Sequence, residues 1–153
     1  MLTNSEIMSF SLSSRIRFFF EGVSQNLNNR RKLKSFIYSI FIREKKKIGT
    51  ISFIFTNDKT IHRINKRYLK HDFFTDIITF ELSEKKEPLM AEIYISCDRV
   101  KENAVVNKTS FNEELHRVIF HGILHLCGYG DKTSRQIKIM RAKEGDYLSK
   151  YFE

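Results

Sequence analysis

The sequence is poor in cysteine, in proline and in long apolar runs, and these shortages exclude several classes of protein. Cys97 and Cys127, the two cysteines, make neither a disulfide framework nor a paired zinc-knuckle pattern, which favours a reducing compartment. The apolar runs fall far short of the roughly 18 to 20 residues that a bilayer span requires. The N-terminus lacks the basic segment and apolar core of a secretory signal. We therefore expect a soluble, cytoplasmic protein that does not contact a membrane.

Acidic residues are too few to balance the basic ones. The chain has 27 Lys and Arg against 18 Asp and Glu, and its formal net charge is +9. Such an excess favours polyanionic partners, because cationic side chains neutralise phosphate groups. Basic clusters occur at residues 30–34, 45–47 and 63–70, although a solvated helix face explains any single cluster more simply. The summed charge predicts nucleic acid as the leading class of partner.

Length and composition fit one globular domain. A chain of 153 residues, of which 41% are apolar, is long enough to form one core. Folding at this size buries about two-thirds of the unfolded surface. The chain has no internal repeats, and its single proline, Pro88, lies in a polar break between two apolar segments. We predict a single domain over residues 15–153, preceded by a flexible N-terminal extension of residues 1–14.

Hydrophobic periodicity predicts strands in the middle of the chain, with helices before and after them. Segments rich in β-branched and aromatic residues predict strands at 15–20, 48–55, 76–82 and 91–96. An apolar stripe over residues 33–41 predicts a helix of about four turns, and Asn57 or Asp58 can cap a shorter one. Capping-box patterns at Ser110 and Thr133 open two long helices. The predicted fold class is α/β (α+β), a single mixed sheet of about four strands covered by helices.

The stretch HGILHLCGYGD, from His121 to Asp131, carries the clearest chemistry. On a helix, His121 and His125 lie one turn apart on the same face, so both rings can reach one metal ion. Gly128 follows where a left-handed turn commonly ends a helix, so the chain can fold back and bring in Asp131. Paired histidines alone also occur as core residues, but the added turn and carboxylate favour a metal site. We predict that His121, His125 and Asp131 bind one metal ion on a long helix of the C-terminal half.

This spacing matches the metzincin peptidases at every position but one. Zinc peptidases place a glutamate general base directly after the first histidine, and this chain has Gly122 there. Peptide hydrolysis by the usual route therefore has no base at the usual position. A zincin-like metal hydrolase of another substrate is an alternative interpretation, which Gly122 and the basic charge disfavour.

The same stretch, preceded by EELHRVIF, resembles the signature H-G-x-L-H-L-x-G-Y-D-H of the YbeY-type rRNA maturation factors. Asn65, Tyr68 and the segments TDIITF and AEIYIS resemble further blocks of that family, as do Met140 and Glu144 downstream. The resemblance covers most of residues 48–148. It implies a single-strand-specific endoribonuclease with one Zn²⁺ per chain. It also implies a role in rRNA maturation, including processing of the 16S rRNA 3′ end, and in ribosome quality control, with rRNA precursors and the small ribosomal subunit as partners.

Two positions depart from the family pattern. Asp131 stands where the family usually has a third histidine, so the implied site has two histidines and one aspartate. A carboxylate is a legitimate zinc ligand. Leu69 stands at the position of the family's active-site arginine, and Arg67 or Lys70 could substitute for that arginine. The missing arginine and the missing glutamate base favour a second interpretation, a non-catalytic ribosome or RNA-binding assembly factor with a structural zinc.

Other side chains are weaker candidates for the site. Arg117 lies one turn before His121 and is a candidate catalytic residue that would stabilise charge developing on a phosphate. An intrahelical ion pair with Glu114 explains Arg117 equally well. Phe73 or Phe74 could stack on unpaired bases, although packing at a strand entry explains them more simply. The remaining histidines and both cysteines lack ligand spacing, and we interpret them as structural or surface residues.

Overall fold

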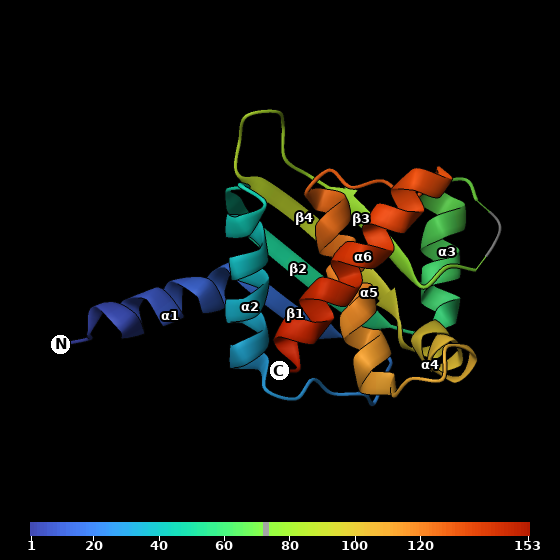
Figure 1. Cartoon of the computed structure of the whole chain (residues 1–153), viewed down its shortest axis with the longest axis horizontal. Helices are drawn as coiled ribbons and strands as arrows, with labels where there is room; N and C mark the ends of the chain where they lie inside the picture. Colours follow the sequence, from blue (N-terminus) through green and yellow to red (C-terminus); the bar gives the residue numbers. More distant parts are fainter. Residues whose placement is uncertain (72–73) are drawn as a thin grey trace.

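One mixed sheet forms the centre of the protein. The computed structural model describes residues 1–71 and 74–153, except for the side chains of residues 8–10, 12 and 13. In this part of the chain the strands are β1 (Ile16–Phe20), β2 (Ile48–Thr56), β3 (Ile77–Glu81) and β4 (Leu89–Ser96). Their order is β1-β2-β4-β3, with β1, β2 and β4 parallel and β3 antiparallel to β4 (Figure 1). The predicted fold class is confirmed.

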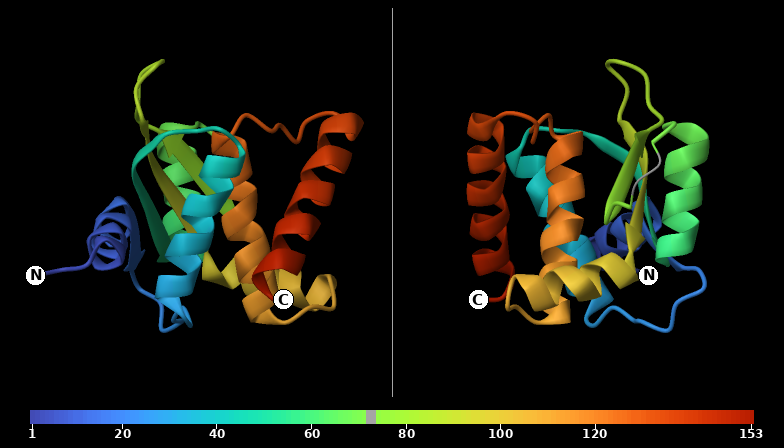
Figure 2. Two further views of the ribbon diagram at one scale, coloured as in Figure 1. Left: turned by 60° about the vertical axis from the view of Figure 1, so that its left-hand side comes forward. Right: turned by 90° about the vertical axis from the view of Figure 1, so that its right-hand side faces the viewer.

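Helices cover both faces of this sheet. They are α1 (Asn4–Arg15), α2 (Arg30–Arg43), α3 (Asp58–Tyr68), α4 (Cys97–Val106), α5 (Phe111–Leu126) and α6 (Ser134–Tyr151). Figure 2 shows α2 and α5 on one side of the sheet, α6 outside α5, and α3 on the opposite side. Within the described residues, none of these helices combines the length and the hydropathy that a bilayer crossing needs.

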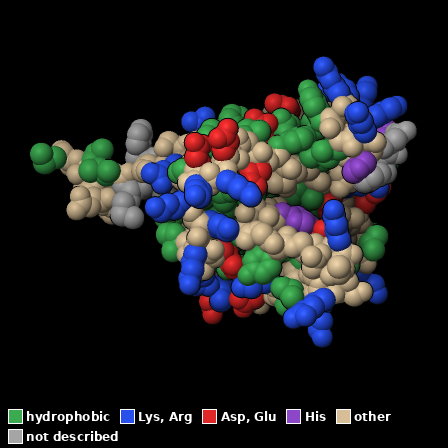
Figure 3. Space-filling view, turned by 90° about the horizontal axis from the view of Figure 1, so that it is seen from above, with side chains coloured by type: hydrophobic (Ala, Val, Ile, Leu, Met, Phe, Trp, Pro, Cys, Tyr) green, Lys and Arg blue, Asp and Glu red, His purple; other side chains and the backbone are tan. Residues whose placement is uncertain are grey.

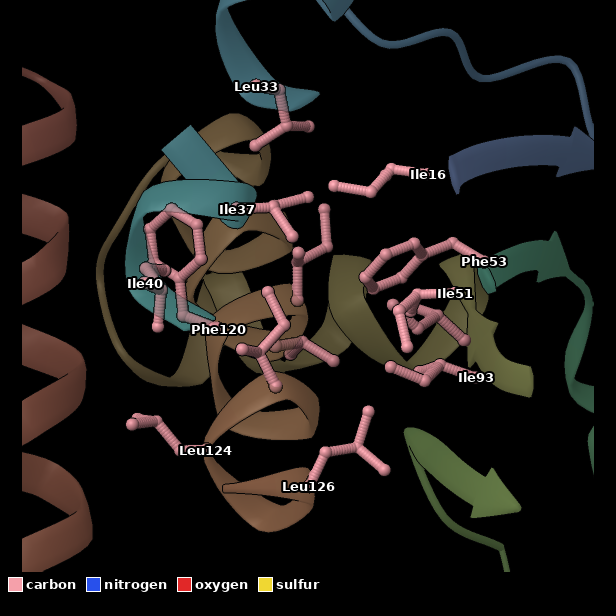
Figure 4. Close-up of a cluster of buried hydrophobic side chains, with 14 of the residues drawn as sticks. Ile16, Leu33, Ile37, Ile40, Ile51, Phe53, Ile93, Phe120, Leu124 and Leu126 are labelled. Atoms are coloured by element: carbon pink, nitrogen blue, oxygen red, sulfur yellow. The ribbon is translucent and has the colours of Figure 1, made fainter. Parts of the chain in front are cut away.

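The main core lies between the sheet and the inner helices α2 and α5 (Figure 4). Fully buried side chains from these elements interdigitate there, among them Leu33, Ile37 and Ile40 of α2, Ile51, Phe53 and Ile93 of the sheet, and Phe120 and Leu124 of α5. Each such side chain contributes roughly 1.5–3 kcal/mol to the free energy of unfolding. The packing therefore holds α5 in a defined position over the sheet.

The predicted helix starts are confirmed by their caps. Asn57, rather than Asp58, caps α3, because its side chain accepts a hydrogen bond from the Thr60 N–H at 2.9 Å. The Ser110 hydroxyl accepts from the Glu113 N–H at 3.0 Å at the start of α5. Thr133 forms a reciprocal capping box with its partner three residues later at the start of α6. Local side-chain chemistry thus sets where these helices begin.

Two helices were not predicted. The segment expected to be an N-terminal extension forms α1, which projects from the rest of the chain (Figure 1). Its start carries reciprocal hydrogen bonds between Thr3 and Glu6, a capping pattern that the sequence already contained. Helix α4 follows β4 directly, and the Ser96 hydroxyl caps it by accepting from the Arg99 N–H. The domain limits predicted at residues 14 and 15 stay a prediction.

Candidate metal centre

Helix α5 lies directly on the sheet at Gly122. A Cβ atom at this position would come within 2.8 Å of Ile77 Cδ1 and 3.3 Å of Ile93 Cγ2. Gly122 therefore allows the close approach that places His121 and His125 beside β3. A glutamate at position 122 would have to displace the end of the Ile77 side chain and press on Ile93, so the packing here favours glycine over the general base of the zinc peptidases.

A Schellman turn ends α5 and redirects the chain toward the histidines. The Gly128 N–H donates to the His125 carbonyl, and the Tyr129 N–H donates to the Leu124 carbonyl, both at 3.0 Å. Gly128 has a φ of 102°, in the left-handed region that favours glycine. The predicted turn is confirmed, and it brings Asp131 beside the two imidazole rings.

Three ligand atoms converge at this point. His125 Nε2 lies 3.0 Å from His121 Nε2 and 3.2 Å from Asp131 Oδ2, and His121 Nε2 lies 3.4 Å from the same carboxylate oxygen. Ligand atoms of a tetrahedral site with zinc-to-nitrogen bonds of about 2.0–2.1 Å lie about 3.3–3.4 Å apart. The three atoms fit one face of such a tetrahedron, and the group could hold a metal ion.

The hydrogen bonds of the two imidazoles orient both Nε2 atoms toward the point of convergence. His125 Nδ1 lies 2.9 Å from the Tyr129 carbonyl oxygen, and His121 Nδ1 lies 3.3 Å from a carboxylate oxygen of Glu144. Both partners accept hydrogen bonds only, so in the neutral rings Nδ1 carries the hydrogen and Nε2 carries the lone pair. Two lone pairs and a carboxylate then face one another, an arrangement that a bound cation stabilises.

Glu144 holds the His121 ring in place from α6. Its side chain is buried and accepts from Arg117 Nη1 at 3.0 Å and from Arg141 Nη1 at 3.1 Å. Burial alone would raise the pKa of Glu144, but the hydrogen bond from His121 and the charges of Arg117 and Arg141 hold that pKa below its usual value. Glu144 is therefore an ionised acceptor that orients the metal-facing ring.

Arg117 is bound by carboxylates on two sides. Its Nε donates to Glu114 Oε1 at 2.9 Å, and its Nη1 donates to Glu144. Glu114 and Glu144 are each only 1% exposed. The intrahelical pair of Arg117 with Glu114, the alternative expected from the sequence, is present. The catalytic role of Arg117 stays a prediction, and its contacts toward the centre run through Glu144 to His121 and, at 3.9 Å from Nη2, to the cleft residue Asp76.

The three candidate ligands open into a cleft of about 620 Å³ between β3 and the loop after α5. Leu69 lines this cleft and is 40% exposed, whereas the described lining residues include neither Arg67 nor Lys70. Asp76 and Lys132 also line it. The structure therefore places a leucine, without a substituting cation from the same helix, beside the candidate centre.

The other candidates lie outside the cleft or outside the described chain. Phe73 lies outside the described residues, and Phe74 stacks on His62 with 4.5 Å between ring centroids. His116 is buried, and its Nδ1 lies 2.6 Å from a backbone carbonyl oxygen of its own helix. Burial raises the pKa of Cys97 to about 11 and that of Cys127 to about 12, so both thiols stay protonated at neutral pH.

Comparison with known proteins decides the family. The family model described as "Endoribonuclease YbeY" matches residues 20–152. The chain belongs to the YbeY endoribonuclease family. It is 42% identical over 134 residues to the endoribonuclease YbeY of Cytophaga hutchinsonii, covering 88% of this chain and 94% of that protein. It is 45% identical over 131 residues to that of Christiangramia forsetii, covering 86% of this chain and 91% of that protein.

A solved structure supports the same assignment. The solution structure of TM1509 from Thermotoga maritima is similar with a TM-score of 0.58 and 30% sequence identity, and the match covers 90% of this chain and 89% of that one. YbeY membership favours neither of the two alternative interpretations, the non-catalytic assembly factor and the metal hydrolase of another substrate.

Lysine and arginine side chains occur on the face that carries the cleft of this YbeY family member (Figure 3), although the described cleft lining itself has Asp76, Glu81 and Asp131 beside Lys132. Figure 3 looks onto the end of the molecule that carries the loop after α5, and histidine side chains lie there in a hollow near the centre of the face. Lysine and arginine side chains stand on several sides of this hollow. The cation excess of the sequence is thus present on the same face as the candidate centre.

Glu144 was not assigned a role from the sequence, although a signal for one was present. The buried face of α6 carries Met140, Glu144, Tyr147 and Tyr151. Glu144 is the acidic residue in this otherwise apolar and aromatic stripe. A buried acid needs a partner, and here the partners are Arg117 and His121.

Glu44 is a second residue that was not assigned a role. It lies just after α2 and accepts hydrogen bonds from the Tyr129 hydroxyl at 2.8 Å, the Tyr147 hydroxyl at 2.7 Å and Lys143 Nζ at 3.1 Å. An acid at a helix C-terminus opposes the helix dipole, so its local position does not explain it. Tyr129 lies between two glycines, and its carbonyl orients His125. Glu44 therefore anchors the loop that completes the centre.

We expect Tyr129→Phe to weaken metal binding roughly three- to tenfold, somewhat less than the roughly 10- to 100-fold typical of a direct orienting partner. The change removes only the hydroxyl that ties the loop to Glu44. Tyr147→Phe is the matched control, because it removes a similar hydrogen bond to Glu44 without touching the loop. Competition with a chromogenic chelator measures both affinities. Equal affinities in the two variants would show that the anchor does not act on the centre.

The environment of Glu44 also predicts that the stability of the fold depends on pH. Burial alone raises the pKa of Glu44, but the hydrogen bonds from Tyr147, Tyr129 and Lys143 outweigh burial and lower it. A carboxyl whose pKa is lower in the folded state stabilises the fold above its unfolded pKa, and this contribution disappears as pH falls through the folded pKa. Between neutral pH and the acid range, the free energy of unfolding of metal-free Glu44→Gln should therefore fall by less than that of the parent. Denaturant titrations at several pH values measure both.

Proposed function

We propose that this protein is a metal-dependent endoribonuclease in which His121, His125 and Asp131 bind one zinc ion. The observation that carries the proposal is the convergence of two imidazole Nε2 atoms and one carboxylate oxygen within 3.4 Å of one another, in an open cleft of a YbeY family member. Two imidazole nitrogens and one carboxylate oxygen are a donor set that catalytic zinc sites use, with a further position open toward substrate.

The residues around the ligands prepare the centre before any ion arrives. Tyr129 and Glu144 hold the two imidazole rings so that both Nε2 atoms face Asp131. When bound, a zinc ion would supply Lewis acidity toward a phosphodiester oxygen or toward water. Arg117 helps to keep Glu144 ionised, and Glu144 in turn holds the His121 ring in its orientation. Gly122 contributes no acid–base group, which suits a phosphodiester substrate better than the peptide route.

Ribosomal RNA is the proposed substrate. The net charge of +9 and the lysine and arginine side chains on the face that carries the cleft favour an RNA strand over a neutral substrate. The motif resemblance to rRNA maturation factors supports rRNA precursors, including the 3′ end of 16S rRNA, with the small ribosomal subunit as partner. A place in ribosome quality control and the cytoplasmic location expected from the sequence stay predictions.

Cleavage assays on defined RNA test the proposal. We expect the zinc-loaded protein to cut single-stranded RNA, the metal-stripped protein to be inactive, and added zinc to restore cleavage. The rate at low RNA concentration should fall steeply with salt, because phosphate contacts release counterions. His125→Ala purified in parallel detects contaminating nucleases. Cleavage by that variant at the parent rate would refute the proposal.

Asp131 is expected to be a ligand that histidine can replace. Asp131→Ala should lower metal affinity by well over roughly tenfold, because it removes a coordinating atom. Asp131→His should retain the ion, since an imidazole supplies a nitrogen at the same position. The Asp131 side chain is 41% exposed, so neither change should unfold the protein. Elemental analysis checks both variants, and full occupancy in Asp131→Ala would mean that the third ligand lies elsewhere.

A further inference from the structure

The free edge of β3 forms one wall of the cleft. The strand has β4 as its sheet neighbour, and residues from Thr75 to Thr79 line the cleft together with both histidines. Its hydrogen bonds to β4 fall on even-numbered residues, because the Ser96 N–H donates to the Asp76 carbonyl at 2.9 Å and the Leu82 N–H donates to the Met90 carbonyl at 2.7 Å. Bonding alternates along an antiparallel pair. The peptide groups of residues 77, 79 and 81 therefore point away from β4.

These same residues face the candidate centre. The Ile77 side chain packs at Gly122 of α5, and alternation along the strand places the Thr79 and Glu81 side chains on that face. The Ile77 carbonyl accepts from the Thr75 hydroxyl at 3.3 Å. Among the described residues, the peptide groups of Thr79 and Glu81 have no partner. They face the space bounded on the other side by the loop that carries Asp131.

Neither a proline nor a β-bulge interrupts this edge, which is five residues long. Natural sheets blunt their edges with proline, bulges or a covering segment. The register of β3 against β4 runs without interruption from Ile77 to Glu81, and no proline lies within it. Open peptide groups beside a candidate catalytic centre indicate a ligand with complementary donors and acceptors.

Unpaired nucleobases are the ligand that fits this wall. Their edges carry N–H donors and oxygen or nitrogen acceptors, and in a duplex the partner strand occupies them. The carboxylates of Asp76 and Glu81 on the β3 side disfavour phosphates, and Lys132 on the opposite side offers a cation for a phosphate. Glu81 can accept from base amino groups, whereas Asp76 already accepts from Asn103 Nδ2 at 3.2 Å. A peptide could also pair with a strand edge, but the basic charge and the YbeY family membership favour RNA.

We infer that a single-stranded RNA segment binds along β3, with its bases on the peptide groups of Thr79 and Glu81 and its backbone toward Lys132. The inference rests on the proposed endoribonuclease function and adds a base-binding wall to it. Selectivity for unpaired RNA then follows from the wall itself, since pairing occupies the Watson–Crick edges of the bases and the deep, narrow major groove of an RNA duplex keeps a strand edge from their other side.

Proline substitution tests the wall. Thr79→Pro removes the outward N–H and leaves the bonds to β4 intact, and proline is tolerated on an edge strand at such positions. Thr79→Val is the matched variant that keeps the N–H. Each variant is titrated in its metal-stripped, non-cleaving form with a short single-stranded RNA and with a copy that lacks its bases, and its metal content is checked on a zinc-loaded sample. We expect Thr79→Val to prefer the intact RNA about tenfold over the abasic copy, and Thr79→Pro to lose most of that preference.

Several outcomes would overturn the inference. Equal base preference in the two variants, with native circular dichroism and full metal content, would show that β3 does not bind bases. The proposed function would not be affected by this result. An extended peptide that binds Thr79→Val but not Thr79→Pro, and competes with RNA, would assign the edge to peptides. If the parent neither binds nor cuts RNA, the proposed function fails and this inference fails with it. Should Thr79→Pro not fold, Glu81→Pro against Glu81→Gln repeats the comparison at the next outward peptide group.

Discussion

Replacing His125 by alanine is expected to remove the metal ion and, with it, all metal-dependent cleavage of RNA. The change deletes one of the three atoms that converge within 3.4 Å of one another. Loss of a partner that merely orients a ligand costs roughly 10- to 100-fold in metal affinity, so loss of the ligand itself should exceed roughly 100-fold. Elemental analysis after purification without chelator, followed by chelator competition, measures the effect.

The control for this experiment is another histidine. His71 is exposed and is not one of the described residues that line the cleft, so His71→Ala should keep about one zinc per chain, as the parent should. Because the His125 side chain is about one-third exposed, its removal should leave the fold intact. A normal metal content in His125→Ala would refute the assignment of the centre.

Arg117→Met is expected to destabilise the fold by roughly 3–5 kcal/mol, because it leaves the buried carboxylates of Glu114 and Glu144 without their shared partner. Denaturant unfolding of the metal-free protein measures this effect without a contribution from metal loss. Adding Glu114→Gln to the variant should recover part of the loss, since it removes one of the uncompensated charges.

The same variant separates the two roles considered for Arg117. A residue that stabilises charge on the substrate would give a folded protein of near-parent stability that binds metal and fails in catalysis. The contacts of the guanidinium favour a structural role. In that case the free energy of unfolding falls, and His121 loses its orientation because Glu144 is no longer held in place. A stable, metal-bound and inactive Arg117→Met would restore the catalytic interpretation.

Much of the fold is encoded in short stretches of sequence. The apolar stripe of α2 and the caps at Asn57, Ser110 and Thr133 each depend on residues within a few positions of one another. Local geometry therefore decides them, and they were predicted correctly. The two unpredicted helices have recognisable caps, but α1 lacks a clear apolar stripe and α4 follows β4 without a break.

The arrangement of the candidate ligands also depends on residues that are close together in the sequence. Two histidines four residues apart, a glycine at a left-handed position and an aspartate shortly afterwards determine most of the geometry of the centre within eleven residues. The periodicity of the helix and the turn at its end leave few ways for these side chains to point. For this reason their convergence could be predicted from the sequence by itself.

Tertiary structure alone decided what surrounds these ligands. Glu144 meets His121 from another helix, Glu44 reaches Tyr129 across 85 positions, and β3 presents its outward peptide groups to the cleft only because it lies at the edge of the sheet. Such pairings depend on how the layers of helix and sheet pack. A buried polar or charged side chain needs a partner, but the sequence does not indicate which residue that partner is. The sequence thus determined a helix with candidate metal ligands on a basic α/β protein, whereas the packing of distant elements decided how that helix is oriented and anchored and how it is exposed to the cleft.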